Sequence, residues 1–358
     1  MAQIRFVRFA LARDCHGCEV GLHLFGGSVM KFGITGAAGF IGRRLCETLT
    51  EKGEAVNVLT RRAGLDVMGV DIYLADLSID NDSALDAFLD DVDVVFHCAG
   101  ELKRDELMYS LHVEGTKRLL AAVGRQCTQK NRNIHWVQLS SVGAYGPPPG
   151  RASEFRVVSE KSVPAPRGMY EVTKTISDEL VLSYSRIEHR FTCSVIRPSN
   201  VIGAGMPNQS FFQMANAVRS GIFFYIGSGE SIATYVHVDD LVAALIACSA
   251  DKRAFNKVYL LSNDCLLHEL ISAIANVSGV KAPFVRVPEF SMRILVGLFS
   301  RVVKLPLTHE RINALVIQTR YASDSIEREL GFRFSKSIPD AIPEMLSKTG
   351  VALHEERP

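Results

Sequence analysis

The chain has 358 residues, of which 47% are hydrophobic and 22% are charged, an ordinary balance for a globular protein. Its 40 basic and 39 acidic residues leave a net charge of +1, so there is no basic excess to neutralise a nucleic-acid backbone, and we expect no nucleic-acid partner. The longest apolar runs, such as residues 294–299, are far shorter than the ~20 residues of a membrane span.

Most of the eight cysteines lie inside apolar runs, as Cys98 and Cys193 do. This usage is typical of reduced core thiols, and it predicts a cytoplasmic protein without a disulfide framework. Cys15 and Cys18 have the spacing of a redox or metal motif, but no second Cys/His pair accompanies them. We therefore expect no metal site.

Residues 1–29 show no clear helix or strand period, and a strand begins abruptly after them at Met30. Charged residues interrupt any apolar core that a signal peptide would need. We expect this segment to lie outside the fold, as a disordered extension or as an artefact of a gene assignment that begins upstream of a natural start at Met30.

From Met30 onward, short apolar runs alternate with helical patterns. Alternating strands and helices indicate βαβ units and a parallel sheet. The Pro/Gly-rich stretch 146–168 is predicted to be a long surface loop. Strands are predicted at residues 31–35, 55–60, 71–74, 92–97, 134–139 and 192–196, and helices at residues 40–52, 107–126 and 170–187.

After about Ser199 the pattern becomes mostly helical, with a strand at residues 258–261. Helices are predicted at residues 210–219, 266–277 and, with amphipathic character, 290–304. We expect the last of these to cap a substrate cleft; a helix lying on a membrane surface is the alternative. The predicted division is a sheet domain of residues 30–198 and 233–264 and a smaller, discontinuous substrate domain of residues 199–232 and 265–358. The smaller domain is expected to cover the carboxyl ends of the strands.

A glycine-rich sequence, TGAAGFIG at residues 35–42, joins the first predicted strand to the first predicted helix. Gly36 permits a tight turn, Gly39 lets backbone N–H groups approach a pyrophosphate, and Gly42 lets the helix pack closely on the strand. The loop predicts a doubly wound, Rossmann-type parallel sheet that binds a dinucleotide. Cofactor contacts are assigned here to Gly36, Gly39, Phe40, Ile41 and Gly42.

The end of the second predicted strand carries Arg61 and Arg62, where an NAD site usually offers a carboxylate to the ribose 2′-hydroxyl. Guanidinium groups suit a 2′-phosphate, so NADP(H) is favoured over NAD(H). Ordinary surface charge at a strand end is the other interpretation. Further cofactor contacts are predicted at Asp76, Leu77, Ala99 and Gly100.

Tyr170 and Lys174 are four residues apart in a helical pattern and so share one face. A nearby ammonium favours the phenolate and lowers the pKa of a tyrosine, which would make proton exchange with a substrate hydroxyl feasible. Ser141, at the carboxyl end of the strand at residues 134–139, is placed to hydrogen-bond the reacting oxygen. The pattern predicts a catalytic group of Ser141, Tyr170 and Lys174.

Further motifs follow in order: VFHCAG at 95–100, SSVGAYG at 140–146, YEVTK at 170–174, RPSNVIG at 197–203, YVHVDDLV at 235–242 and RELGF at 328–332. With them, the chain from about Met30 to Met345 resembles the extended short-chain dehydrogenase/reductase family, the NAD-dependent epimerase/dehydratase group. The resemblance implies a Rossmann domain with a smaller substrate domain, a Ser/Tyr/Lys triad and a homodimer. It also implies that Ser141 rather than Ser140 is the catalytic serine, that Lys174 holds the nicotinamide ribose and that Pro198 lines the nicotinamide.

The chain departs from this family pattern at several positions. His112 replaces an asparagine of many relatives, and we expect a structural role for it rather than a catalytic one. Residues 142–144 lack the Asp-Glu pair of sugar-nucleotide dehydratases, which argues against dehydration. Asn200 matches a position that contacts the nucleotide diphosphate in sugar epimerases, but Ala233 stands where those enzymes often place an arginine. Arg311 is our candidate to supply that charge.

Three functions are consistent with these residues. The leading one is an NAD(P)-dependent epimerase or 4-keto-reductase of a nucleotide-linked sugar. The second is an NADPH-dependent reductase of a lipid-like or aromatic ketone, as in the hydroxysteroid and dihydroflavonol branch; it is favoured by Ala233 and by the apolar residues 290–299. The most remote is a non-catalytic dinucleotide sensor.

Overall fold

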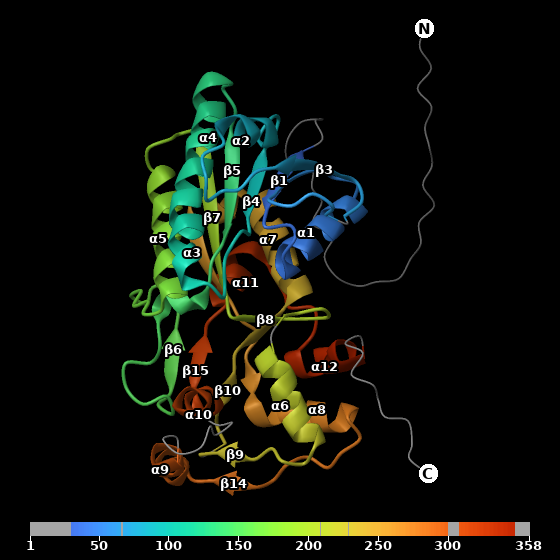
Figure 1. Ribbon diagram of the computed structural model, residues 1–358, viewed down its shortest axis with the longest axis vertical. Helices are drawn as coiled ribbons and strands as arrows, with labels where there is room; N and C mark the ends of the chain where they lie inside the picture. Colours follow the sequence, from blue (N-terminus) through green and yellow to red (C-terminus); the bar gives the residue numbers. More distant parts are fainter. Residues whose placement is uncertain (1–29, 66, 208, 228, 300–307, 348–358) are drawn as a thin grey trace.

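The computed structural model describes residues 30–65, 67–207, 209–227, 229–299 and 308–347 (Figure 1). The predicted extension at residues 1–29, with Cys15 and Cys18, lies outside the described residues. Among the described residues, no helix is long and apolar enough to cross a membrane.

A seven-stranded sheet, in the order β3-β2-β1-β4-β5-β7-β12, forms the larger part of the molecule. All of its neighbouring strands are parallel, and the chain reverses its direction of travel across the sheet between β1 and β4. This is the doubly wound topology that the alternating pattern predicts. The strands are β1 (Lys31–Thr35), β2 (Ala55–Thr60), β3 (Val70–Leu74), β4 (Val94–His97), β5 (Ile134–Leu139), β7 (Phe191–Pro198) and β12 (Lys257–Leu261).

Helices cover both faces of the sheet, because both faces of a parallel sheet are apolar. One core contains α1 (Phe40–Glu51), α7 (Val238–Ala250) and α11 (Asp324–Leu330). The other contains α2 (Asp82–Phe88), α4 (Gly115–Gln129) and α5 (Met169–Tyr184). Ile326 and Phe332, which lie in the predicted substrate domain, pack into the first core with Ile34. The predicted domain boundaries otherwise stay a prediction.

The helix predicted at residues 107–126 is three consecutive segments. These are α3 (Asp105–Tyr109), a π-helical turn η1 (Ser110–Glu114) and α4. A π turn inserts one extra residue per turn, and such turns occur frequently at functional sites. It rotates the side chains before it relative to α4, and it contains the buried His112.

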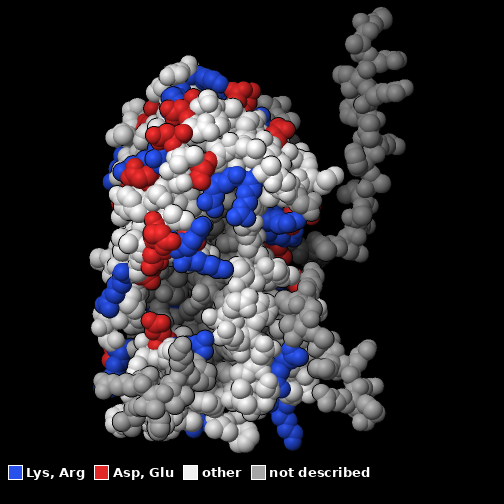
Figure 2. Space-filling view, viewed as in Figure 1, with Lys and Arg blue, Asp and Glu red and all other residues white. Residues whose placement is uncertain are grey.

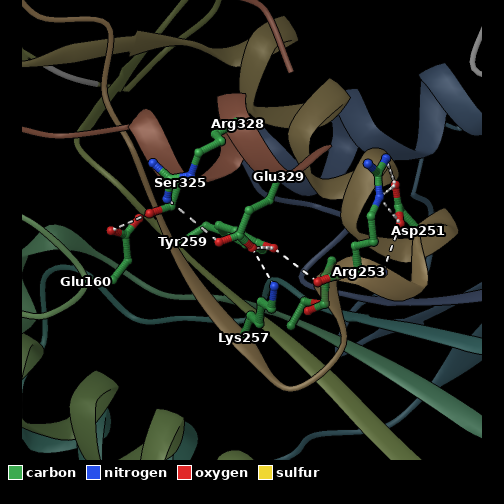
Figure 3. Close-up of polar contacts among 10 residues, drawn as sticks. Glu160, Asp251, Arg253, Lys257, Tyr259, Ser325, Arg328 and Glu329 are labelled. Atoms are coloured by element: carbon green, nitrogen blue, oxygen red, sulfur yellow. Dashed lines mark hydrogen bonds and ion pairs between the residues drawn. The ribbon is translucent and has the colours of Figure 1, made fainter. Parts of the chain in front are cut away.

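The outer edge of β12 is covered by side chains rather than by another strand (Figure 3). The Glu160 carboxylate accepts the Leu260 N–H at 3.0 Å and the Ser325 hydroxyl at 3.0 Å. One oxygen of Glu329, on α11, accepts both the Lys257 ammonium and the Tyr259 hydroxyl. These contacts give the Leu260 N–H at the edge of β12 a hydrogen-bond partner, and they hold α11, which carries the start of the RELGF motif, against that edge.

The stretch predicted as a surface loop at residues 146–168 contains a strand, β6 (Arg156–Val158). It pairs in parallel with β15 (Thr319–Tyr321), far along the chain. Pro and Gly density marks the turns on either side of this strand, but a pairing with so distant a partner leaves no local signal.

The smaller part of the molecule lies beyond the carboxyl ends of the large sheet (Figure 1). Its core joins α6, α8 and α12 to short strand pairs. Its helices are α6 (Gln209–Arg219), α8 (Leu267–Val277), α9 (Glu289–Phe299), α10 (His309–Val316) and α12 (Ile338–Ser347). Its strand pairs are β8 (Asn200–Ile202) with β11 (Tyr235–His237), β9 (Tyr225–Ile226) with β14 (Arg286–Val287), and β10 (Ile232–Ala233) with β13 (Cys265–Leu266).

Candidate active site

Several predicted cofactor residues and the predicted catalytic Ser141 follow the carboxyl ends of parallel strands, so the sheet brings them to one edge, whereas Tyr170 and Lys174 lie on α5. Gly36 follows β1, Arg61 follows β2, and Ala99 follows β4. Because β1 lies between β2 and β4, the glycine turn sits between the other two segments at the topological switch point. Ser141 follows β5, and Pro198 ends β7 on the same side.

The glycine turn is shaped by close backbone contacts. Gly36 has a φ of 76°, and a Cβ there would lie 2.6 Å from the backbone nitrogen of Ala99. A Cβ on Gly42 would overlap the Gly36 carbonyl oxygen. Gly39 is the N-cap of α1 and has no side chain to cap the first N–H groups. The residues therefore form a cradle at a helix N-terminus that fits a pyrophosphate.

The second strand ends beside this turn with two exposed arginines. The Arg61 guanidinium lies 3.9 Å from the Asp76 carboxylate, which follows β3. The hydrogen bonds that Asp76 accepts from Ser78, together with the Arg61 charge, hold the pKa of Asp76 below its usual value against the opposing effect of burial. Among the described residues, Arg62 forms no ion pair. Its backbone N–H donates to the Thr60 hydroxyl oxygen.

Ser141 starts a short 3₁₀ turn, η2 (Val142–Tyr145). Its Oγ accepts the Gly143 N–H at 3.1 Å, which leaves its hydroxyl proton for another acceptor. A Cβ on Gly143 would meet the Glu171 side chain at 3.0 Å, so η2 packs directly on the start of α5. Ser141 is thereby held next to the turn of α5 that carries Tyr170.

Helix α5 starts where it does because Glu171 caps it. Its carboxylate accepts the backbone N–H groups of Arg167 (2.8 Å) and Gly168 (3.2 Å). Tyr170 therefore lies in the first turn, and Lys174 follows one turn later on the same face. Lys174 is 4% exposed.

The electrostatics of this pair differ from the sequence expectation. Burial and, to a lesser extent, the Asp178 carboxylate together raise the pKa of Tyr170 to about 12. Burial also lowers the pKa of Lys174, against the effect of Asp178. The sequence prediction of a lowered Tyr170 pKa is therefore wrong. Residue spacing shows that Lys174 shares a face with Tyr170, but it carries no information about desolvation. At neutral pH the phenol holds its proton and is an acid.

A buried ion pair, which sequence reasoning missed, anchors the same helix. Asp178 is fully buried and accepts hydrogen bonds from Arg197 (3.0 Å) and from the Ser140 hydroxyl (2.6 Å). Arg197, on β7, also donates to the Tyr145 hydroxyl at 3.1 Å. The sequence did contain a signal for this residue. Asp178 stands four residues after Lys174, so its carboxylate lies on the same helix face as Tyr170 and Lys174, and a carboxylate on a buried face needs a partner.

His112 joins the loop after β4 to α5. Its Nε2 accepts the Glu101 N–H at 2.8 Å, so its proton is on Nδ1, which lies 2.8 Å from the Thr173 Oγ1. Its ring stands edge-on to that of Tyr170, with centroids 5.6 Å apart. Burial and the Lys174 charge lower the pKa of His112 to about 4, so it is neutral at physiological pH. These contacts tie the loop after β4 to α5, and the structural role expected for His112 stays a prediction.

A second polar network crosses the switch point inside the protein. His97, on β4, lies between the hydroxyls of Thr35 (2.7 Å) and Thr116 (3.1 Å). Thr116 also contacts the Ser177 hydroxyl on α5, which accepts from the Gln138 amide. The network joins β1, β4, β5, α4 and α5, and it fixes the distance between the glycine turn and the helix of Tyr170.

The predicted substrate residues are less closely grouped. Asn200 is exposed on β8, and its amide donates to the Thr234 carbonyl at 3.1 Å. Arg311 lies on α10 and donates to the Gln213 side chain at 2.9 Å. Ala233, 7% exposed, belongs to the core of the smaller part. Figure 2 shows the molecule hollowed between its two parts, with Lys and Arg side chains gathered on the sheet side of the hollow.

The NAD dependent epimerase/dehydratase family model matches residues 33–261, more than half of the chain. The chain belongs to this family, and it is an NAD-dependent enzyme of the oxidoreductase type. The family assignment agrees with the resemblance carried by the motifs.

The chain is 25% identical to the sterol-4-alpha-carboxylate 3-dehydrogenase, decarboxylating, of Mus musculus, over 91% of this chain and 93% of that protein. It is 27% identical to the dTDP-6-deoxy-L-talose 4-dehydrogenase (NAD(P)(+)) of Kitasatospora kifunensis, over 72% and 82%. The UDP-glucose 4-epimerase of Thermotoga maritima, solved with UDP-glucose, superposes with a TM-score of 0.67 at 18% identity, over 89% of this chain and 98% of that one. That likeness shows the shared fold.

Replacing Asp178 by asparagine should destabilise the protein by about 3–5 kcal/mol, because it leaves the Arg197 guanidinium buried without its counter-charge. Urea unfolding measures the loss. Asp91→Asn is the matched control, since Asp91 pairs with Arg132 at the surface and such pairs contribute about 0–1 kcal/mol. Equal stabilities of the two variants would contradict the assigned role of the pair.

Proposed function

We propose that the protein interconverts a ketone and a secondary alcohol on an apolar, lipid-like or polycyclic substrate. The observation that carries this proposal is the burial of Ala233 at the position where the family resemblance places a diphosphate-binding arginine. The other predicted cation for a diphosphate, Arg311, already donates to Gln213. The sterol substrate named for the mouse relative supports the same class. This reverses the order expected from the sequence, in which a nucleotide-linked sugar came first.

We assign the proton to Tyr170. Its raised pKa keeps it a neutral phenol, which suits donation to a ketone oxygen. The buried Lys174 ammonium stabilises the phenolate that remains, and the Ser141 hydroxyl, with its Oγ already accepting from Gly143, donates to the same substrate oxygen. The nicotinamide, when bound, supplies the hydride. His112 and the Asp178–Arg197 pair hold these groups in place.

We assign the dinucleotide to the cradle of Gly36, Gly39 and Gly42, with Phe40 and Ile41 in the first turn of α1. Arg61 and Arg62 favour NADP(H), since both guanidinium groups are exposed beside the cradle. Remaining contacts of the proposed cofactor site are Asp76, Leu77, Ala99, Gly100 and Pro198.

A nucleotide-linked sugar is the second candidate, with epimerisation or 4-keto reduction as the reaction. The exposed Asn200 on β8 favours it, and so does the sugar substrate named for the Kitasatospora relative. An epimerase returns the hydride to its substrate, so it consumes no net NAD(P)H, whereas a ketone reductase consumes it stoichiometrically.

We also propose a homodimer and a cytoplasmic location. The six described cysteines are all free thiols, which suits a reducing compartment. An apolar groove on the outer face of α5, lined by Val172, Ile176 and Leu180 among others, is the surface a second copy would cover.

Tyr170→Phe should lower NADPH-dependent reduction of a steroid ketone by at least ~10²-fold, because the substrate oxygen loses its proton donor. NADPH oxidation, followed by absorbance, measures this. Tyr109→Phe, an exposed tyrosine on α3, is the control and should be unaffected. Turnover of a nucleotide sugar without net NADPH loss would favour the second candidate, and unchanged turnover in Tyr170→Phe would rule out the assigned acid.

The pH dependence should differ between the two directions. A phenol with a pKa of about 12 is protonated throughout the neutral range, so kcat/KM for ketone reduction should be flat between about pH 6 and 9. Alcohol oxidation needs the phenolate, whose fraction rises about tenfold per pH unit below the pKa, so its kcat/KM should climb steadily from about pH 7 to 10. A plateau of the oxidation rate near pH 7 would show that the phenol is far more acidic.

Replacing both Arg61 and Arg62 by alanine should weaken NADPH binding by more than about tenfold, since hydrogen bonds to a charged group each contribute about 1.5–3 kcal/mol. NADH binding, which involves no 2′-phosphate, should change little. Fluorescence titration with both cofactors gives the two ratios, and Arg253→Ala at η3 (Lys252–Ala254) is the control. Equal losses for NADPH and NADH would remove the 2′-phosphate assignment.

A further inference from the structure

Helix α9 is apolar on two opposite faces. Met292 and Val296, one turn apart, are buried against Ile226, Ile312 and Val316. Phe290 and Ile294, also one turn apart, are 75% and 45% exposed on the outer side, and Leu295 beside them is 45% exposed. A surface helix normally shows polar residues to solvent. The inner stripe explains how α9 packs on the smaller part of the molecule, but nothing in that packing uses the outer stripe.

The neighbouring strand pair continues this exposed apolar surface. Phe284 is 86% exposed, Val285 is 50% exposed, and Ile222 just before β9 is 70% exposed. The Tyr225 N–H donates to the Val285 carbonyl at 2.9 Å, which ties the two segments together, and β14 runs directly into α9. We name Ile222, Phe284, Val285, Phe290, Ile294 and Leu295 the distal apolar surface. Figure 1 places β9, β14 and α9 together at the end of the molecule farthest from the sheet.

The segments that carry the distal apolar surface contain more basic than acidic residues. Residues 219–227 and 279–297 contain four basic residues, Arg219, Lys281, Arg286 and Arg293, and one acidic residue, Glu289. Glu289 is paired with Arg293 at 2.7 Å, so the segments carry an excess of positive charge. The Arg286 guanidinium lies over the Tyr225 ring, 5.3 Å from its centre. Exposed aromatic and aliphatic side chains among basic ones are the pattern of a surface that inserts shallowly into an anionic lipid interface.

We propose that the distal apolar surface docks the protein peripherally on an anionic lipid bilayer. The apolar side chains enter the boundary between headgroups and acyl chains, and the basic side chains contact the lipid phosphates. Packing on the smaller part of the molecule accounts for the inner stripe of α9 only, and the predicted capping of a substrate cleft does not account for the exposed outer stripe. The inference goes beyond the proposed function and explains how an apolar substrate dissolved in a bilayer would reach the enzyme.

Sedimentation of the full-length protein with vesicles tests the proposal. Vesicles of phosphatidylcholine with phosphatidylglycerol should carry down the protein, whereas vesicles of phosphatidylcholine alone should carry down much less. The double variant Phe284→Ser, Phe290→Ser should reduce the bound fraction at least tenfold. Ile187→Ser is the matched control, since Ile187 is 74% exposed and lies just before β7, at the amino ends of the strands. It should bind as the unchanged protein does.

Two results would overturn the proposal: no sedimentation with either vesicle, or equal binding by the double variant. Conversion of a dimer to a monomer by the double variant in analytical ultracentrifugation, without vesicle binding, would assign the surface to a second copy instead. The vesicle assay contains neither substrate nor dinucleotide, so its result is independent of the ketone-reduction assay. Reduction of a water-soluble ketone by the double variant should equal that of the unchanged protein.

Discussion

A single buried ion pair sets the orientation of the helix on which the proposed chemistry depends. Asp178 on α5 and Arg197 on β7 are both inside the protein, where either charge alone would be costly. The helix can therefore lie only with Asp178 turned toward Arg197. Tyr170 and Lys174, two turns and one turn earlier on the same face, are turned to the carboxyl edge of the sheet. In the proposed mechanism, the Lys174 ammonium favours negative charge on the phenol oxygen once that oxygen has given up its proton.

In the proposed function, the two parts of the molecule have different roles. The sheet holds the turn of Gly36 against the end of β4 through contacts that admit no side chain, which suits the pyrophosphate of the dinucleotide proposed to bind there. In the proposed function, the smaller part determines which second substrate binds. Its core buries Ala233 where a cation would favour a diphosphate, and its far end exposes apolar side chains. In the proposed function both features serve one property of the substrate, its low polarity.

The strands and helices of the larger part were predictable, because each carries its own period and its own turn residues. The failures are instructive. The pairing of β6 with β15 joins segments some 160 residues apart, as the partners Arg156 and Thr319 show, and neither has a strand pattern long enough to recognise. The π turn that contains His112 lies between two α-helical segments, and the sequence shows one continuous helical pattern across all three. In the smaller part the sequence predicted helices but not the short strand pairs that pack with them, because those strands are only two or three residues long.

The sequence by itself determined the parallel sheet, the glycine cradle and the spacing of Tyr170 and Lys174, because these depend on local periodicity and on residues near one another in the chain. The tertiary structure alone decided how that site behaves. Desolvation by the surrounding elements raises the pKa of Tyr170, and Asp178, seemingly one more polar residue of a helix, becomes the counter-charge of Arg197. Burial and charge pairing are properties of three-dimensional packing, so spacing along the chain can place Asp178 on the face of Lys174 but cannot name Arg197 as its partner or show that Tyr170 is desolvated.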